Sequence, residues 1–214
     1  FIILYKQNKK HGKCTYWNEK GEKIKEGNYN MGQMDGLWTY WYDNGNIKFE
    51  GQFSNGDGSN PDDFDIPQNG RNGKSTHWNE NGSKEGERNF KKGIIDGLIT
   101  VWYENGQKYI EGNSIDGNPD GLITTWYQNG QKMEETNYKE GVRDGLNNYW
   151  LENGEKITEL IYLDDKEWNG YYTELNEDRQ KIRRLNYKGG IIDGLLTMWY
   201  ENGQKRFEGN FKIK

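Results

Sequence analysis

Residues 96–108 read DGLITVWYENGQK, and residues 193–205 read DGLLTMWYENGQK. In both stretches an Asn-Gly pair separates two runs that are rich in β-branched and aromatic residues. Such runs favour strands, and an Asn-Gly pair between them is the strongest short-range signal of a β-hairpin. The pair predicts a type I′ turn, in which both central residues have a positive φ. We therefore expect residues 97–103 and 107–113 to form antiparallel strands around Asn105 and Gly106.

The same pattern recurs along the chain, and its first glycine marks the period. That glycine begins eight units, at Gly12, Gly36, Gly73, Gly97, Gly121, Gly145, Gly170 and Gly194. Successive units are 24 or 25 residues apart, except that 37 residues separate the second glycine from the third. A fixed period of roughly 20–50 residues indicates a repeat architecture, which overrides any assignment made segment by segment.

Several positions within the unit keep their residue type. Counted from the first glycine, the fifth residue is Trp, the ninth Gly, the eleventh Lys and the fourteenth Glu, each in seven units. We expect recurring residues to be structural, because a catalytic site is needed once whereas every unit needs the contacts of a ladder. The structural positions that we single out are Trp17, Trp41, Trp78, Trp102, Trp126, Trp150, Trp199, Gly36, Gly97, Gly121, Gly145 and Gly194.

Alternation of side chains along a strand assigns the residues to two faces. The first, third and fifth residues after the glycine share one face, as in Leu98, Thr100 and Trp102. Glu at position fourteen is then expected opposite Thr at position three, for example Glu135 opposite Thr124, with hydroxyl-to-carboxylate hydrogen bonds between them. The other face carries rings above glycines. A bulge at the glycine corners would exchange the assignments, so the sequence leaves open which face holds the core.

The composition agrees with a sheet that is held together by rings. Only 31% of the 214 residues are hydrophobic, but 9 are Trp, 15 Tyr and 7 Phe, against 3 Pro. Disordered chains are poor in aromatic residues and rich in Pro, so the aromatic content argues against disorder. Each ring buries roughly 150–250 Å², and one or two rings per unit would offset the shortage of aliphatic residues.

The repeats predict an all-β fold. We expect an elongated, single-layer meander of about eight antiparallel β-hairpin repeats, twisted or curled, with a period of 24 residues. Residues 1–11 are expected to form a lead-in or capping strand, and residues 12–214 the repeat domain. An acidic insertion at about residues 57–69 accounts for the one longer spacing.

Charge, cysteine content and motifs exclude several functions. The formal net charge is −5 and no basic patch is present, so we expect no nucleic-acid partner, and the charge argues against an anionic membrane surface. Cys14 is the single cysteine, which excludes an internal disulfide and a cysteine-based zinc cluster; we expect a small, semi-buried side chain. The chain has no catalytic or cofactor-binding motif, and we expect neither an enzyme nor a cofactor.

The insertion is the first departure from the repeat. It contains Asp57, Asp62, Asp63 and Asp65 within nine residues. Clustered carboxylates bind Ca²⁺, so these four residues are calcium candidates, although the spacing of an EF-hand loop is missing. A solvated loop is the preferred interpretation, and a partner-binding protrusion is a further alternative.

Two further departures concern one unit and the histidines. The unit that begins at Gly170 has Leu175 in place of Trp and Arg179 in place of the second glycine. A worn repeat is the preferred interpretation, and a bend or a distinct surface is the alternative. His11 and His77 are too few and too far apart for a zinc pattern, and we expect His77 to lie on the face of the sheet.

The stretches at residues 96–108 and 193–205 resemble the bacterial variant of the MORN repeat, and the resemblance extends over residues 12–214 except the insertion. It implies a β-hairpin repeat scaffold. Many bacterial members of this family are labelled as YwqK-type antitoxins, and other MORN proteins are linked to protein–protein scaffolding and to phospholipid binding. The resemblance therefore implies a protein partner and an antitoxin-like or immunity-like role.

These observations predict a non-enzymatic scaffold that mediates protein–protein interaction, because exposed Trp and Tyr anchor interfaces at low entropic cost. A cell-envelope or carbohydrate-binding protein is the alternative, since aromatic rows also stack on sugars, and phospholipid binding ranks below both. The chain begins at Phe1 and not at Met, so we expect a trimmed start. A signal peptide or anchor upstream, and with it membrane contact, stays open, as does the choice between bacterial cytoplasm and cell envelope.

Overall fold

The computed structural model describes residues 4–212, so residues 1–3 of the expected lead-in and residues 213–214 of the expected repeat domain lie outside the described part. Residues 4–212 form 18 strands and no helix, and they accordingly offer no helical segment suited to crossing a membrane. The strands are β1 (Tyr5–Lys6), β2 (Lys9–Lys10), β3 (Gly12–Trp17), β4 (Lys23–Asn30), β5 (Gln33–Trp41), β6 (Ile47–Gly56), β7 (Arg71–Trp78), β8 (Lys84–Lys91), β9 (Ile94–Trp102), β10 (Lys108–Ile115), β11 (Asn118–Trp126), β12 (Lys132–Lys139), β13 (Val142–Trp150), β14 (Lys156–Leu163), β15 (Lys166–Leu175), β16 (Lys181–Lys188), β17 (Ile191–Trp199) and β18 (Lys205–Lys212).

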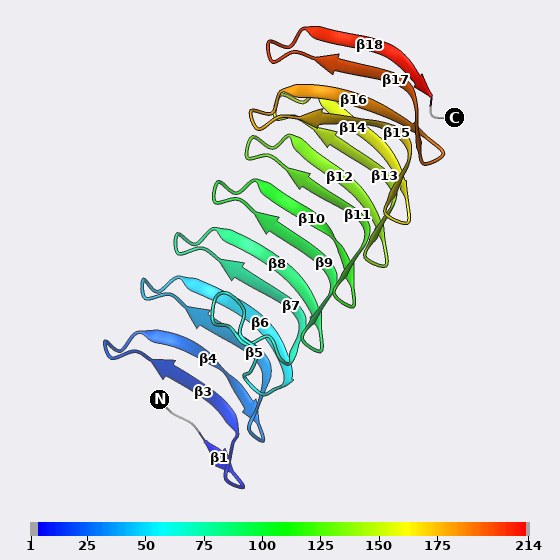
Figure 1. Cartoon of the computed structure of the whole chain (residues 1–214). Coiled ribbons are helices and arrows are strands. Elements are labelled where there is room, and N and C mark those ends of the chain that lie inside the picture. Colours follow the sequence, from blue (N-terminus) through cyan, green and yellow to red (C-terminus); the bar gives the residue numbers. More distant parts are fainter. Residues whose placement is uncertain (1–3, 213–214) are drawn as a thin grey trace. The chain divides into compact units, whose positions relative to one another are not determined.

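The chain divides into two compact units, Phe1–Asn118 and Pro119–Lys214. In the first unit β3 to β10 lie side by side in chain order, each antiparallel to the next, and β11 to β18 do the same in the second. Within each unit the hairpins stack in a single layer and bend along their length (Figure 1). The expected all-β meander of antiparallel hairpins is thus confirmed, and the register places Glu135 opposite Thr124, as the repeat pattern predicts.

The Asn-Gly corners do not have the expected type I′ geometry. At the β9–β10 corner, Gly106 has a φ of 83° whereas Asn105 has no positive φ. The Gly106 N–H donates to the Tyr103 carbonyl and the Tyr103 N–H donates to the Gln107 carbonyl, each at 2.9 Å. This is a three-residue loop, a type I turn followed by a glycine bulge. Asn is useful here because its side-chain Oδ1 accepts the Gln107 N–H at 3.0 Å.

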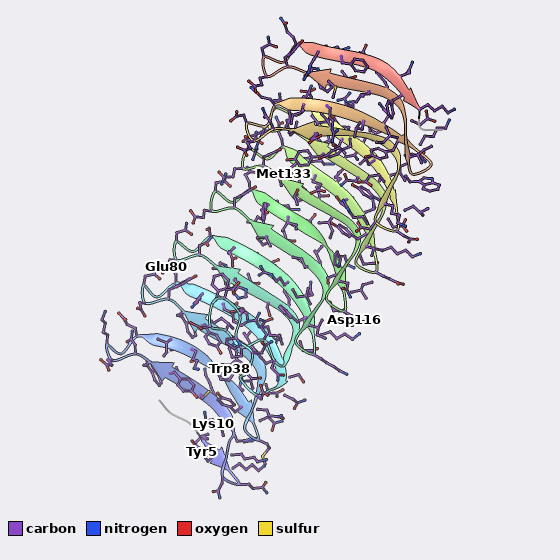
Figure 2. The ribbon with its side chains drawn as sticks, in the orientation of Figure 1. Tyr5, Lys10, Trp38, Glu80, Asp116 and Met133 are labelled. Carbon is purple, nitrogen blue, oxygen red and sulfur yellow. The ribbon has the colours of Figure 1, made fainter. Side chains whose placement is uncertain are left out.

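The type I′ geometry belongs to the opposite edge of each hairpin stack. Glu140 and Gly141, which join β12 to β13, have φ values of 51° and 89°, and Lys139 pairs directly with Val142. Two-residue turns of this hand match the twist of the flanking strands. In the first unit, Glu80 marks the three-residue edge and Asp116 the two-residue edge (Figure 2).

The glycine that begins each repeat unit lies within a strand, not at a corner. Gly97, for example, has a φ of 115° and lies against the Asn89 side chain, where the register between β8 and β9 shifts. A bulge of this kind bends the strand and increases its twist. Of the other first glycines that we singled out, each also has a positive φ: Gly36, Gly121, Gly145 and Gly194.

The N-terminal lead-in is a short hairpin where a single strand was expected. Strands β1 and β2 pair antiparallel around Gln7 and Asn8, whose φ values are 50° and 60°. The Lys10 carbonyl accepts the Gly32 N–H at 2.8 Å, which ties this hairpin to the β4–β5 corner.

The hydrophobic core of the first unit lies on the face opposite the recurring Thr. We call the face that bears Leu, Thr and Trp at positions one, three and five the threonine face, and the opposite one the ring face. Trp38, at position two, is fully buried on the ring face and lies above Gly27, where a Cβ would be 2.2 Å from the indole (Figure 2). The core consists of Cys14, Met34, Trp38, Tyr40, Phe49, Phe53 and Ile66.

The recurring Trp side chains are not in this core, although each hairpin was expected to contribute one to a ladder of rings. Trp17 is 38% exposed, and the other recurring Trp residues are half-buried. Trp38, the single core tryptophan, is not part of the recurring pattern. A one-layer sheet has two faces, and the ring face of the first unit is the one that is covered.

Candidate binding site

The recurring residues of the threonine face contact one another. The Lys at position eleven pairs with the Glu at position fourteen in six hairpins: Lys23–Glu26, Lys84–Glu87, Lys108–Glu111, Lys132–Glu135, Lys156–Glu159 and Lys205–Glu208. In the first hairpin the Thr15 hydroxyl also donates to Glu26 at 2.9 Å, which is the cross-strand bond expected from the sequence. The hydrogen bond from Lys13, together with those from Lys23 and Thr15, outweighs burial and lowers the pKa of Glu26 to about 2.

The recurring Trp and Lys also connect successive hairpins. The ammonium groups of Lys23, Lys84 and Lys181 lie 5.6, 5.7 and 5.8 Å from the ring centres of Trp41, Trp102 and Trp199, one hairpin further along. Cation–π contacts at exposed sites contribute about 0.5–1 kcal/mol each, and exposed ion pairs about 0–1 kcal/mol. The recurring side chains therefore hold one another in place along the sheet.

The acidic insertion packs on the ring face of the first unit through Phe64 and Ile66, whereas most of its other residues are exposed, as expected for a solvated loop. Ile66 is 1% exposed and belongs to the core, and Phe64 packs against that core. The Phe64 ring lies 5.0 Å from the ring of His77 on β7. Burial of such a side chain stabilises the fold by roughly 1.5–3 kcal/mol, which explains why the loop covers the sheet.

A buried charge cluster fixes the insertion to the sheet. Asp62 accepts hydrogen bonds from Arg71 at 2.6 Å and from His77 at 3.0 Å. Arg71 is 2% exposed, and its guanidinium lies between the rings of Phe49 and Phe90. Burial raises the pKa of Asp62, but the hydrogen bonds from His77 and Arg71 outweigh it and hold that pKa well below its usual range. Asp62 is therefore an ionised anchor.

The four calcium candidates do not converge. Asp62 is occupied by Arg71 and His77, and Asp57 accepts the Ser59 N–H at 2.9 Å within its own turn. Asp63 and Asp65 are exposed. Among residues 4–212, no three His, Cys, Asp or Glu side chains lie close enough to hold a metal ion. The structure therefore does not bring the four candidates together, since Asp57 serves a turn and Asp62 an ion pair.

His77 lies on the sheet face, as expected, and is 2% exposed. Cys14 is more deeply buried than the semi-buried side chain that we expected, at 1% exposed. Burial raises the pKa of its thiol. A protonated thiol in the core is a packing group, because the thiolate is the reactive form.

The second unit carries an open hollow where the first unit has its loop-covered core. We call it the tyrosine hollow; its volume is about 360 Å³. Its walls combine rings, hydroxyls and one charge of each sign. The lining residues are Glu134, Arg143, Asn147, Tyr149, Ile157, Thr158, Tyr162, Tyr172, Thr173 and Leu175.

Strands β12 and β13 present the polar wall of the tyrosine hollow. Glu134 pairs with Tyr149 across the strands, and its Oε1 accepts hydrogen bonds from Thr136 at 2.7 Å and from Asn147 at 3.0 Å. The Tyr149 hydroxyl lies 3.4 Å from that of Tyr127. This network holds the Glu134 carboxylate at the wall of the hollow.

Arg143 on β13 and the hairpin that departs from the repeat contribute further residues to the lining of the hollow. The Arg143 guanidinium lies 4.1 Å from the centre of the Tyr162 ring, and its Nε donates to Asp165. Tyr172 is 42% exposed, which leaves a ring at the rim of the hollow. The Gly170 unit thus contributes Tyr172, Thr173 and Leu175 to the lining of the hollow.

One repeat position carries a sequence signal for this site. At position fifteen, Gly27 and Gly51 admit large rings in the first unit, whereas Thr136 and Leu160 occupy that position in the second. This departure lies outside the recurring positions, so the repeat pattern did not single it out. Glu134 and Arg143 are equally invisible in the linear sequence, because only the strand pairing brings them together.

Comparison with protein families matches five segments to the MORN repeat variant, residues 34–55, 71–92, 95–116, 119–140 and 192–212. Each segment corresponds closely to one hairpin, and together they cover just over half of the chain. No curated protein matches the sequence. Residues 141–191, which supply most of the tyrosine hollow, lie outside the matched segments. With its matched hairpins and its pattern of antiparallel pairing, the chain belongs to the MORN repeat variant family.

Proposed function

We propose that this chain is a non-enzymatic binding scaffold that recognises a protein partner through the tyrosine hollow. The observation that supports this is the contrast between the two units: the insertion covers the core of the first and leaves a hollow of about 170 Å³ beside it, whereas the second keeps a hollow of about 360 Å³. Tyr residues anchor protein interfaces because a ring brings a large contact area at low entropic cost.

The recurring residues are less suited to specific recognition. Their Trp, Lys and Glu side chains already contact one another along the threonine face. Because this surface repeats in every hairpin, a partner could also bind it in several equivalent positions along the sheet. The tyrosine hollow departs from the repeat, and this supports it as the place where a specific partner binds.

Photo-crosslinking in the native host tests the proposal. A photoreactive amino acid is placed at Tyr172, and a control at Leu195, which is equally exposed, at 42%, on the threonine face of the same unit. We expect one protein to be captured in high yield from position 172 and not from position 195. That protein is then purified, and its dissociation constant is measured for the wild type and for Tyr172→Ala.

We expect Tyr172→Ala to weaken the binding of the purified partner at least about tenfold, the range of an interface anchor. Equal capture from both positions, or an unchanged dissociation constant, would contradict the proposal. Binding of a glycan by the same hollow on a glycan array would instead support the carbohydrate-binding alternative. Salt-sensitive binding to anionic vesicles would support the phospholipid-binding alternative.

The finer hypothesis is an antitoxin-like or immunity-like role, in which the partner is a bacterial toxin. It is supported by the family resemblance. Co-expression tests it: the chain should restore growth of cells that produce the captured partner, and Tyr172→Ala should restore it less. A captured partner that does not impair growth would exclude this role and leave the binding scaffold intact.

A further inference from the structure

The Glu134 carboxylate is held at the wall of the tyrosine hollow by hydrogen bonds to only one of its two oxygens. Thr136 and Asn147 both donate to Oε1. Within the described residues no donor reaches Oε2 of the same carboxylate. An ionised acceptor at the wall of a partly enclosed site is a strong partner for a cationic donor, because charge-assisted hydrogen bonds are about twice as strong as neutral ones.

The positive charge in the hollow is already neutralised. Arg143 donates to Asp165 and lies over the Tyr162 ring. Around the Tyr162 hydroxyl, burial and the carboxylates of Glu167, Asp165 and Glu134 raise the pKa, and Arg143 alone opposes them. Of the two charged side chains that line the hollow, Arg143 is thus paired, whereas Glu134 has no cationic partner among the described residues, which favours a cation as the occupant.

A cationic side chain with an apolar stem also needs an apolar surface for its methylene groups, and the rings of the hollow provide one. Tyr149 and Tyr172 line the hollow, and Ile157, which is 1% exposed, contributes an aliphatic surface. Long basic side chains bury their methylene groups against such surfaces while their charged ends stay paired or hydrated. A cation is also attracted to the faces of aromatic rings.

We propose that the tyrosine hollow receives a lysine or arginine side chain of the protein partner, with Glu134 as its counter-charge. This inference rests on the proposed function and specifies the chemistry of the partner. The interface on the partner is accordingly basic at the point that enters the hollow, and its methylene stem packs between Tyr149 and Tyr172.

Titration with capped tripeptides tests the inference without the partner. The probes are acetyl-Gly-Lys-Gly-amide, its arginine counterpart, and a neutral control with norleucine, which keeps the methylene stem. Nuclear magnetic resonance follows the Asn147 side-chain amide and the Tyr172 ring. We expect the basic peptides to bind with millimolar dissociation constants and Glu134→Gln to weaken them about tenfold, whereas Glu177→Gln, an exposed control with the same charge change, leaves them unchanged.

The outcomes separate this inference from the proposed function. The proposal that a basic side chain enters the hollow would be overturned by any of three results. These are equal binding of the norleucine peptide, preference for a glutamate peptide, or no change in the resonances at about 20 mM basic peptide. A partner that still crosslinks at position 172 would then keep the scaffold function. If Glu134→Gln fails to fold, as judged by its circular dichroism, Tyr172→Ala replaces it, since an exposed ring carries little of the fold. Loss of peptide binding in that variant supports the inference, and unchanged binding overturns it.

Discussion

The absence of a side chain at Gly27 is what admits the indole of Trp38 to the core. A Cβ at Gly27 would lie 2.2 Å from that indole, which is fully buried. Gly209 occupies the same repeat position in the last hairpin, and its neighbour is Phe207, whose side chain is 50% exposed. The same residue in the same repeat position therefore has different importance, because only one of the two rings is confined.

We predict that Gly27→Ala lowers the free energy of unfolding by about 3 kcal/mol, because the confined indole has to leave its position. Gly209→Ala, where a Cβ would lie 2.9 Å from Phe207, should cost less than about 1 kcal/mol since the exposed ring can turn away. Urea unfolding followed by tryptophan fluorescence measures both. Similar losses in the two variants would show that Trp38 is not the confined group.

Arg179 adopts a backbone conformation that suits glycine. Its φ is 59°, and its N–H donates to the Asn176 carbonyl, as the Gly106 N–H does to Tyr103 in a regular hairpin. A residue with a Cβ pays roughly 1–2 kcal/mol for the left-handed region, whereas glycine loses about 0.5–1 kcal/mol of chain entropy. The difference favours glycine at this corner.

We predict that Arg179→Gly raises the free energy of unfolding by about 0.5–1 kcal/mol. Arg179→Ala is the matched control: it removes the same charge but keeps the Cβ, so it should bring no gain. Urea midpoints of the purified variants give the comparison. Equal stabilisation by both variants would assign the effect to the arginine side chain and not to the backbone.

At the scale of the element, the insertion at residues 57–69 closes a sheet face with one ion pair and two apolar side chains. Arg71 is 2% exposed and lies between two rings, so it depends on Asp62 for its counter-charge. Removal of one partner of a buried pair is strongly destabilising, because it leaves an uncompensated charge. The insertion is thus a structural cover that is held by the ion pair and by its two apolar side chains.

We predict that Asp62→Asn lowers the stability of the first unit by about 3 kcal/mol at neutral pH, and that Asp63→Asn, an exposed neighbour, costs less than about 0.5 kcal/mol. The pKa of Asp62 is depressed in the folded chain. Its contribution is therefore complete above the unfolded value of about 3.9 and is lost as the pH falls toward the folded one.

Urea midpoints of the wild type and of Asp62→Asn, measured from neutral pH to below pH 4, check the sign. The difference between the two proteins should shrink only in the acidic part of that range. A difference that vanishes instead as the pH rises would mean that Asp62 is protonated in the fold. Proteolysis within residues 57–69 should also become faster in Asp62→Asn.

At the scale of the whole molecule, each hairpin obtains its stability from its neighbours in the sheet. In a repeat protein, stability is approximately a sum of the repeats and their nearest-neighbour interfaces. Phe49 and Phe53 on β6 are 0% and 3% exposed, because β7 and the insertion cover them. Phe207 and Phe211, at the same repeat positions on β18, are 50% and 46% exposed. Stability should therefore differ strongly between these two hairpins.

We predict that the backbone amides of β17 and β18 exchange with solvent at least about tenfold faster than those of β5 and β6. Hydrogen exchange followed by mass spectrometry, with peptides from the two hairpins, measures the difference. The repeat positions are matched, so intrinsic exchange rates can be compared residue by residue. Equal protection would show that the chain opens as one cooperative unit.

The sequence predicted the hairpins and their register because those depend on residues that are close in the chain. The Asn-Gly pairs at a period of 24 residues set the strand limits, and Thr124 therefore meets Glu135. It did not predict the turn type at Asn105 and Gly106, because Asn suits both a positive φ and a side-chain hydrogen bond to the backbone. Nor did it predict the position of the insertion, since Asp62 meets Arg71 and His77 only after the loop folds back.

By itself, the sequence determined an all-β repeat: local turn chemistry and alternation recur in every unit, so each unit reinforces the same pairing. The tertiary structure decided which face is covered and which stays open. Gly27 leaves room for the buried indole of Trp38, and this matters only when their strands pack. Glu134, Arg143 and Tyr172 form one hollow because the pairing of β12 to β15 brings them together. Recognition depends on that convergence, which a linear pattern does not contain.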